Sequence, residues 1–188
     1  MNDKIYTRKG DEGFTQLANG QQVLKNDLVL ETDGALEELS SWIGYCLDQG
    51  VNTSVQEELK VILGHLLVVA GSLIGEVSSH QIAGFVAFLE NHIDAKVAVL
   101  PPLRTFIIPA GHTTVSSLHL ARTVCRRAER LVVALEHLER LPNPSIISYL
   151  NRLSDYLFIL ARYSAQRLLV TDMPWIPAGL ATDPSDSV

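Results

Sequence analysis

The chain has 188 residues, of which 47% are hydrophobic and 19% are charged, and its formal net charge at pH 7 is −6. This amount of apolar material can bury a core, so a disordered chain is excluded and one domain is the simplest expectation. An acidic chain is a poor general binder of nucleic acid, so no nucleic-acid partner is expected.

Hydrophobic periodicity predicts an all-α protein, a five-helix up-and-down bundle. The first thirty residues show no helical period, and we expect an ordered loop or a short extended segment there. Apolar residues then recur at spacings of three and four, as amphipathic helices require. The predicted helices cover residues 31–49, from the capping residues 52–54 to about 76, 80–93, 114–139 and 145–170.

Proline residues mark one connection between the predicted helices and the C-terminal tail. Pro101 and Pro102 interrupt the helical pattern, and residues 104–109 are predicted to be extended. Residues 1–170 therefore form the predicted single domain. Residues 171–188 contain three prolines and no basic side chain, and we expect them to be a loosely ordered tail.

The apolar segments indicate neither a membrane partner nor secretion. The longest, residues 61–75, is shorter than the roughly 20 residues that span a bilayer. The N-terminus carries charges where a signal peptide has its apolar stretch.

Cys46 and Cys125 lie far apart in the sequence and are expected to be free core residues. These features predict a cytoplasmic protein, and its scattered histidines predict no metal site made by the protein.

Arginine is concentrated in one helical segment. Arginine outnumbers lysine ten to five, and four of the ten arginines lie between residues 122 and 130. Arg122, Arg126, Glu129 and Arg130 share one side of the predicted helix. One carboxylate cannot neutralise three guanidinium groups, so we predict a bound anion or a carboxylate from another chain. A solvated face with contacts between successive helical turns is the alternative.

The N-terminal sequence TRKGDEGFT, residues 7–15, is a second candidate anion site. Its glycines, Gly10 and Gly13, allow backbone N–H groups to approach phosphate oxygens closely, and two threonines and two cations flank them. The pattern is neither a P-loop nor a dinucleotide-binding fingerprint. An ordinary polar turn is the alternative.

Two further polar sets lie on predicted helices. Glu37 and Glu38 stand early in the first helix, where the helix dipole alone can account for them. A row on one face of the last helix could bind a ligand, bridge helices or face water. The members of this row are Asn151, Asp155, Phe158 and Arg162.

These segments, in this order, resemble the PduO-type ATP:cob(I)alamin adenosyltransferases from Tyr6 to about Tyr163. The matching stretches are residues 7–15, 24–27, 34–44, 106–111, 118–135 and 149–162. The resemblance implies a homotrimer of five-helix bundles with ATP at each subunit interface. The cobalt of cob(I)alamin would attack the 5′ carbon of ATP, which gives adenosylcobalamin and triphosphate. Mg²⁺ would be held mainly by the ATP phosphates.

The same resemblance implies roles for individual residues. Arg122 would pair across the interface with Glu37, and Phe106 would stand over the corrin and exclude a lower ligand of the cobalt. On composition alone, Phe106 could equally be a core aromatic. The implied partners are a corrinoid reductase and an adenosylcobalamin-dependent enzyme. The implied ATP contacts are Thr7, Arg8, Lys9, Gly10, Thr15, Gln16, Lys25, Arg126, Arg127, Ala128, Glu129, Arg130 and Asn151.

Residues 34–41 depart from the pattern of that family, which usually reads G-E-x-D-E-L-N-S. Here Ala35, Glu37 and Ser40 replace the usual Glu, Asp and Asn. The longer Glu37 moves its carboxylate by about 1.5 Å, and a misplacement of this size can cost roughly 100-fold in a positioned site. One alternative is therefore a trimer that binds ATP and a corrinoid with weak or no turnover, as a carrier or regulator. A purely structural helical scaffold is the third hypothesis.

Overall fold

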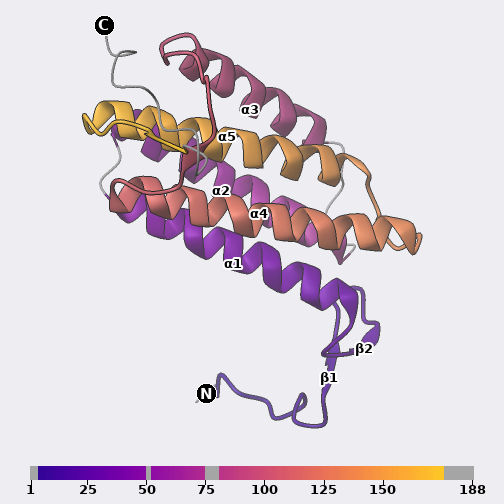
Figure 1. Ribbon diagram of the computed structural model, residues 1–188. Helices are drawn as coiled ribbons and strands as arrows, with labels where there is room; N and C mark the ends of the chain where they lie inside the picture. The colour runs from indigo at the N-terminus through magenta and orange to yellow at the C-terminus, as the bar shows by residue number, and fades with distance from the viewer. Residues whose placement is uncertain (1–3, 50–51, 75–80, 176–188) are drawn as a thin grey trace, which may run out of the picture.

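The computed structural model describes residues 4–49, 52–74 and 81–175, and these residues are mostly helical. The helices are α1 (Leu28–Asp48), α2 (Thr53–Leu73), α3 (Ile82–Val97), α4 (Thr113–His137) and α5 (Ser145–Arg167). They lie side by side, with α4 packed against α1 and α5, and with α3 at the edge beside α5 (Figure 1). The predicted all-α architecture of five helices is therefore confirmed.

No helix within the described ranges has the length and apolar character needed to cross a membrane.

Side-chain caps determine where the first two helices begin. The Asp27 carboxylate accepts a hydrogen bond from the Val29 N–H at 2.9 Å, so α1 starts at Leu28. The sequence predicts a start at residue 31, because the periodic pattern alone does not register this cap. Asn52 caps α2 as predicted, since its side-chain oxygen accepts from the Val55 N–H at 3.0 Å.

The N-terminal segment contains a short hairpin, which agrees with the extended segment expected there. Strand β1 (Phe14–Gln16) pairs with β2 (Gln22–Leu24) in antiparallel register. Gly20, with φ of 86°, lies in the connecting turn, where a left-handed conformation favours glycine. Figure 1 shows this hairpin beyond the beginning of α1, outside the helical bundle.

A second ribbon joins two segments that are distant in the sequence. Strand β3 (Ile107–Ile108) lies in the predicted extended connection between α3 and α4. It pairs in antiparallel register with β4 (Met173–Pro174), which follows α5. The sequence assigns residues 171–175 to a loosely ordered tail, yet they include this strand. Residues 176–188 of the predicted tail lie outside the described residues.

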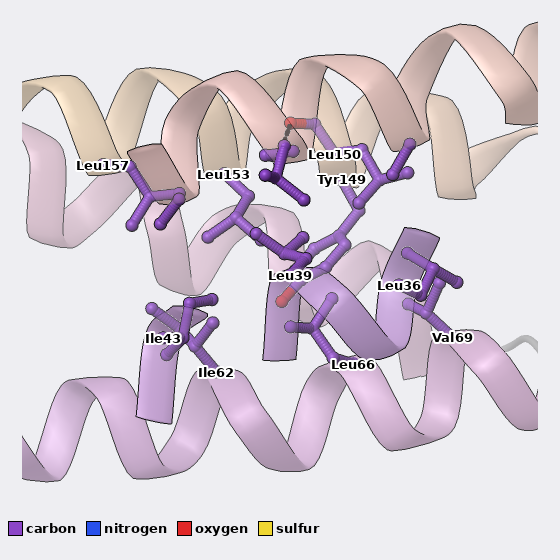
Figure 2. Close-up of a cluster of buried hydrophobic side chains, with 14 of the residues drawn as sticks. Leu36, Leu39, Ile43, Ile62, Leu66, Val69, Tyr149, Leu150, Leu153 and Leu157 are labelled. Carbon is purple, nitrogen blue, oxygen red and sulfur yellow. Dashed lines mark hydrogen bonds between the residues drawn. The ribbon is translucent and has the colours of Figure 1, made fainter. Parts of the chain in front are cut away.

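The core lies between the long helices, and Figure 2 shows its centre. Leucine, isoleucine and valine side chains from α1, α2 and α5 interdigitate around the ring of Tyr149. Cys46 and Cys125 are buried and free, as expected. Burial raises the pKa of the Cys46 thiol to about 12, so this thiol stays protonated and unreactive at neutral pH.

One charged cluster is buried in the bundle and links α2, α3 and α5. The Lys96 ammonium, 5% exposed, forms an ion pair with the Glu58 carboxylate, 8% exposed. The Tyr156 hydroxyl donates to the same carboxylate at 2.7 Å. Lys96 also lies over the rings of Tyr156 and Tyr163, at 5.2 and 5.6 Å from their centres. The paired charges and hydrogen bonds compensate for the loss of water around these groups.

Candidate functional site

The N-terminal segment and its hairpin form a cavity of about 440 Å³. Phe14 and Gln22 line it together with five residues that the sequence assigns to ATP. These five residues are Thr7, Lys9, Gly10, Thr15 and Gln16. The structure therefore brings a large part of the predicted nucleotide loop around one space.

The backbone of this loop places Lys25 against it. The Gly13 N–H donates to the Gly10 carbonyl at 3.2 Å, and the Lys25 N–H donates to the Gly13 carbonyl at 2.8 Å. A Cβ atom at Gly10 would lie 2.8 Å from Lys25 Nζ, so a side chain there would displace the lysine. Lys9 and Lys25 thus flank a glycine turn, an arrangement suited to phosphate oxygens.

Arg8 belongs to the same loop but is absent from the lining of this cavity. Its φ is 62°, a left-handed conformation that few residues other than glycine adopt. Its guanidinium lies 5.5 Å from the centre of the Tyr6 ring, and both side chains are exposed. Arg8 is therefore available at the surface beside the glycine turn.

A second cavity, of about 450 Å³, lies between the β3 segment, α4 and α5. Its walls combine apolar side chains, two guanidinium groups and one carboxylate. The lining residues are Leu103, Phe106, Ile107, Arg122, Arg126, Ser154, Asp155 and Phe158. Three residues predicted for the site, Phe106, Arg122 and Arg126, meet here.

Phe106 is a surface residue in this chain. Its side chain is 79% exposed, and its ring meets the edge of the Trp175 ring with the centres 6.4 Å apart. The alternative interpretation of Phe106 as a core aromatic is therefore wrong. An exposed aromatic at the rim of a partly apolar cavity is suited to contact a flat ligand.

Arg122 is half-buried and incompletely hydrogen-bonded. Its Nε is buried and has no hydrogen-bond partner within the described part of the chain. Its guanidinium lies 6.0 Å from the centre of the Phe158 ring. Burial, together with the neighbouring Arg126 charge, lowers the pKa of Arg122. This N–H is therefore available to an acceptor that the described part of the chain does not supply.

The predicted partner of Arg122, Glu37, lies on α1 and is exposed. The two form no ion pair within residues 4–49, 52–74 and 81–175 of one chain. The two other replaced positions of this segment serve the helix itself. Ala35 is buried in the core, and the Ser40 hydroxyl donates to the Leu36 carbonyl at 2.9 Å.

The remaining arginines of α4 differ in their partners. Arg127 forms an ion pair with Glu38 of α1. Arg126 and Arg130 are exposed, and neither forms an ion pair among the residues that the structure describes. These two guanidinium groups therefore provide the free positive charge that the sequence predicts on this helix.

Two other predicted contacts of α4 have structural roles. Glu129 accepts a hydrogen bond from the Asn151 side-chain amide at 3.0 Å, which ties α4 to α5. Ala128 is fully buried among core residues, so its methyl group faces away from the exposed arginines.

A third cavity is an open groove of about 980 Å³ between α1 and the beginning of α4. Trp42 and Tyr45 of α1 and Leu120 of α4 supply its apolar surface, with the two aromatic rings edge to face at 5.7 Å. Leu120 and Tyr45 are about half exposed. The groove lies close to Glu38 and to the arginine helix.

Several lining residues of the second cavity were not assigned to the site by the sequence. Leu103 lies in an irregular connection, and Ile107 lies in the predicted extended segment, whose pattern does not single it out for the site. Asp155 and Phe158 belong to the polar row on α5, which was the available signal. The last member of the row, Arg162, does not line this cavity. Its Nε donates to the Asp172 carboxylate at 2.8 Å instead.

Two histidines inside the bundle, the half-buried His65 and the buried His119, are neutral at pH 7. Burial lowers the pKa of His65 and of His119 to about 4. The ring of His65 stacks on Phe85 with the centres 3.7 Å apart. Among the described residues, no group of three or more His, Cys, Asp or Glu side chains is placed to hold a metal ion.

The family model for cobalamin adenosyltransferase matches residues 5–164 of this chain. The corrinoid adenosyltransferase of Bacillus subtilis is 39% identical over 179 residues, which cover 92% of each chain. The human corrinoid adenosyltransferase MMAB is 41% identical over 175 residues, which cover 87% of this chain and 70% of the human protein.

Solved structures agree with these sequence matches. A variant of the PduO-type ATP:corrinoid adenosyltransferase from Lactobacillus reuteri, complexed with ATP, superposes with a TM-score of 0.85 at 34% identity. That match covers 92% of this chain and 100% of the other. A second variant of that protein, complexed with cobalamin and ATP, has a TM-score of 0.83 at 34% identity and covers 92% of this chain and 96% of the other.

Proposed function

This chain belongs to the cobalamin adenosyltransferase family, and from that premise we propose that it transfers the 5′-deoxyadenosyl group of ATP to the cobalt of cob(I)alamin. The products are adenosylcobalamin and triphosphate. The observation that carries this proposal is the second cavity, which the exposed Phe106 lines together with Arg122 and Arg126. A flat apolar substrate and a polyphosphate can both be accommodated around such a space.

The reaction is a displacement in which the Co–C bond forms as the bond between C5′ and the triphosphate oxygen breaks. The nucleophile is already strong, so the protein mainly positions the two substrates, which can contribute roughly 7–11 kcal/mol. Lys9, Lys25, Arg126 and Arg130 carry the charge that would stabilise the departing triphosphate. Mg²⁺, held mainly by the phosphates, would add to this charge stabilisation.

Phe106 acts on the corrinoid by excluding a ligand. Its bulky ring at the rim of the cavity would leave no room for water or an imidazole below the cobalt. A cobalt without that lower ligand is easier to reduce to the nucleophilic state. Leu103 and Ile107 line the same cavity as Phe106, and their apolar side chains support the same exclusion.

We propose that the working unit is a homotrimer, because each chain carries two partial sites. No residue lines both the N-terminal cavity and the second cavity. The hairpin lies outside its own bundle (Figure 1), where it can reach a neighbouring subunit. The groove with Trp42 and Tyr45 offers apolar contact area, and the unpartnered Nε of Arg122 fits the carboxylate of a neighbouring Glu37.

Sedimentation velocity tests this assembly. The expected result is one species of three times the chain mass at micromolar concentration with MgATP. A monomer under these conditions would contradict the shared site. Glu37→Gln should weaken the trimer, and Glu57→Gln on the exposed surface of α2 is the matched control.

An assay with chemically reduced cobalamin separates the three hypotheses for this chain. Formation of adenosylcobalamin from ATP supports the enzyme. Binding of MgATP and cobalamin without turnover would support the carrier or regulator, and no binding by calorimetry would support the structural scaffold. As an enzyme it would act in the cytoplasm, between a corrinoid reductase and an adenosylcobalamin-dependent enzyme, without nucleic acid or membrane.

A further inference from the structure

The segment that carries Phe106 has little support of its own. It connects α3 to α4 and has regular structure only in the two residues of β3, which pair with the two residues of β4. The Trp175 N–H donates to the Phe106 carbonyl at 2.8 Å, and the Trp175 ring meets the Phe106 ring. A two-stranded ribbon of this length is not stable alone, so something else must hold it.

Arg162 of α5 provides that anchor. Its side chain is 6% exposed, and its Nε donates to the Asp172 carboxylate at 2.8 Å. Its Nη2 donates to the Pro101 carbonyl at 2.9 Å. Asp172 directly precedes β4, and Pro101 lies on the approach to β3. One planar guanidinium therefore binds both segments that lead into the ribbon, Asp172 directly before β4 and Pro101 six residues before β3, a geometry that a lysine ammonium does not reproduce.

Two smaller contacts hold the ends of the same segment to α5 and its continuation. The Gln166 side-chain amide donates to the Val99 carbonyl at 3.2 Å. Gly111 packs against Val170, and a Cβ atom at Gly111 would lie 3.0 Å from the valine Cγ1. The segment from Val99 to Gly111 is thus held near its beginning by Gln166 and Arg162, and its end lies against Val170, which follows α5.

We propose that Arg162 is a positioning residue for adenosyl transfer, and that through Asp172 and Pro101 it holds the β3–β4 ribbon so that Phe106 keeps its place over the corrinoid. Arg162 does not line the cavity, and its partner Asp172 does not either. Their effect on the reaction therefore passes through the ribbon. This inference rests on the proposed function for its consequence at the cobalt, but not for the anchoring itself.

The anchoring is tested by amide hydrogen exchange of the protein without substrates. Asp172→Ala removes the carboxylate, and we expect the amides of residues 105–108 and of Trp175 to exchange at least about tenfold faster, as loss of a charge-assisted hydrogen bond predicts. Arg162→Lys keeps the charge and should give an intermediate increase. Lys96→Met is the matched control, because it breaks the other buried ion pair and should leave exchange in this ribbon unchanged.

The consequence at the cobalt is tested by the spectrum of bound cob(II)alamin with MgATP. The four-coordinate signal should fall in Asp172→Ala in proportion to the loosening of the ribbon, while the affinity for MgATP stays at the wild-type value. Wild-type exchange in a folded Asp172→Ala protein overturns the proposal, as does a faster exchange that leaves the signal intact. Equal loosening by Lys96→Met also overturns it. A wild-type protein without the four-coordinate signal contradicts the proposed function, and the exchange experiment still decides the anchoring.

Discussion

Phe106→Ala removes a side chain whose stability role and catalytic role are separable. With 79% of the side chain exposed, about a fifth of its surface is buried. Full burial of a phenylalanine is worth roughly 1.5–3 kcal/mol, so a fifth of it amounts to roughly 0.3–0.6 kcal/mol. The edge-on contact with Trp175 adds roughly 0.5–1.5 kcal/mol.

The expected loss in the free energy of unfolding is therefore about 1–2 kcal/mol, below the roughly 3–5 kcal/mol of a core phenylalanine. Turnover with cob(II)alamin and a mild reductant should fall much further, because a lower ligand can then bind the cobalt. We expect a loss of about tenfold or more, which corresponds to about 1.4 kcal/mol in the barrier. Pre-reduced cob(I)alamin binds no lower ligand, so its turnover should suffer less.

The assay compares both corrinoid states beside a thermal melt and a titration with MgATP. Phe88→Ala is the control, since Phe88 packs on the core from α3 and contacts His65 and His92 instead of the cavity. This control should lose stability without separating the two corrinoid states. An equal loss in both assays, matched by the folded fraction, would refute the role given to Phe106.

Three further predictions concern other parts of the chain. Arg126→Ala should lower kcat/KM for MgATP by roughly 10–100-fold, because it removes a charge-assisted contact worth about 1.5–3 kcal/mol. The control variant Arg167→Ala should leave kcat/KM unchanged. Unchanged kinetics in Arg126→Ala would show that Arg126 does not belong to the site. Lys96→Met should lower the free energy of unfolding by roughly 3–5 kcal/mol in denaturant titrations, because it leaves the Glu58 carboxylate buried and unpaired. A loss of less than about 1 kcal/mol would contradict the pairing of Lys96 with Glu58. Burial lowers the pKa of His119 from 6.5 to about 4 in the folded protein. Between these two pH values the unfolded chain therefore binds more protons than the folded protein does. The free energy of unfolding should consequently fall as the pH is lowered through this range. His119→Gln should flatten that part of the pH profile, and an unchanged profile would show that other groups cause it.

The helices could be predicted from the sequence because their apolar residues repeat at helical spacing. Leu36, Leu39 and Ile43 form one such row, and all three are buried. The start of α1 was less visible, since it depends on one hydrogen bond from Val29 to Asp27. Periodicity shows which face of a helix is buried, but it does not show at which residue a side-chain cap begins the helix.

The charged cluster and the second ribbon could not be predicted for a different reason. Charged residues such as Glu58 and Lys96 are rarely buried unless they are paired, and their burial becomes favourable only when α2 and α3 bring them together. Strand β4 has two residues and exists only because β3 lies beside it. Such long-range pairings leave no periodic signal in either segment.

The candidate site was predicted in part. The glycine turn and the arginine helix were visible as local patterns, and each now lines or borders a cavity. The apolar wall of the second cavity was not visible, because Leu103 lies in an irregular connection and the extended pattern around Ile107 does not point to a site. Phe106 could be singled out only through the family resemblance, and its exposure then removed the core alternative.

Carbon transfer from ATP to cobalt is the central claim, and ATP labelled with ¹³C at the 5′ position tests it most directly. The protein, MgATP and chemically reduced cobalamin are combined without oxygen, and the corrinoid product is examined by NMR while the phosphate products are quantified. We predict that the labelled carbon is bound to cobalt and that one triphosphate is released for each adenosylcobalamin formed. Labelled carbon that remains in ATP or ADP, with no Co–C bond formed, would contradict the account.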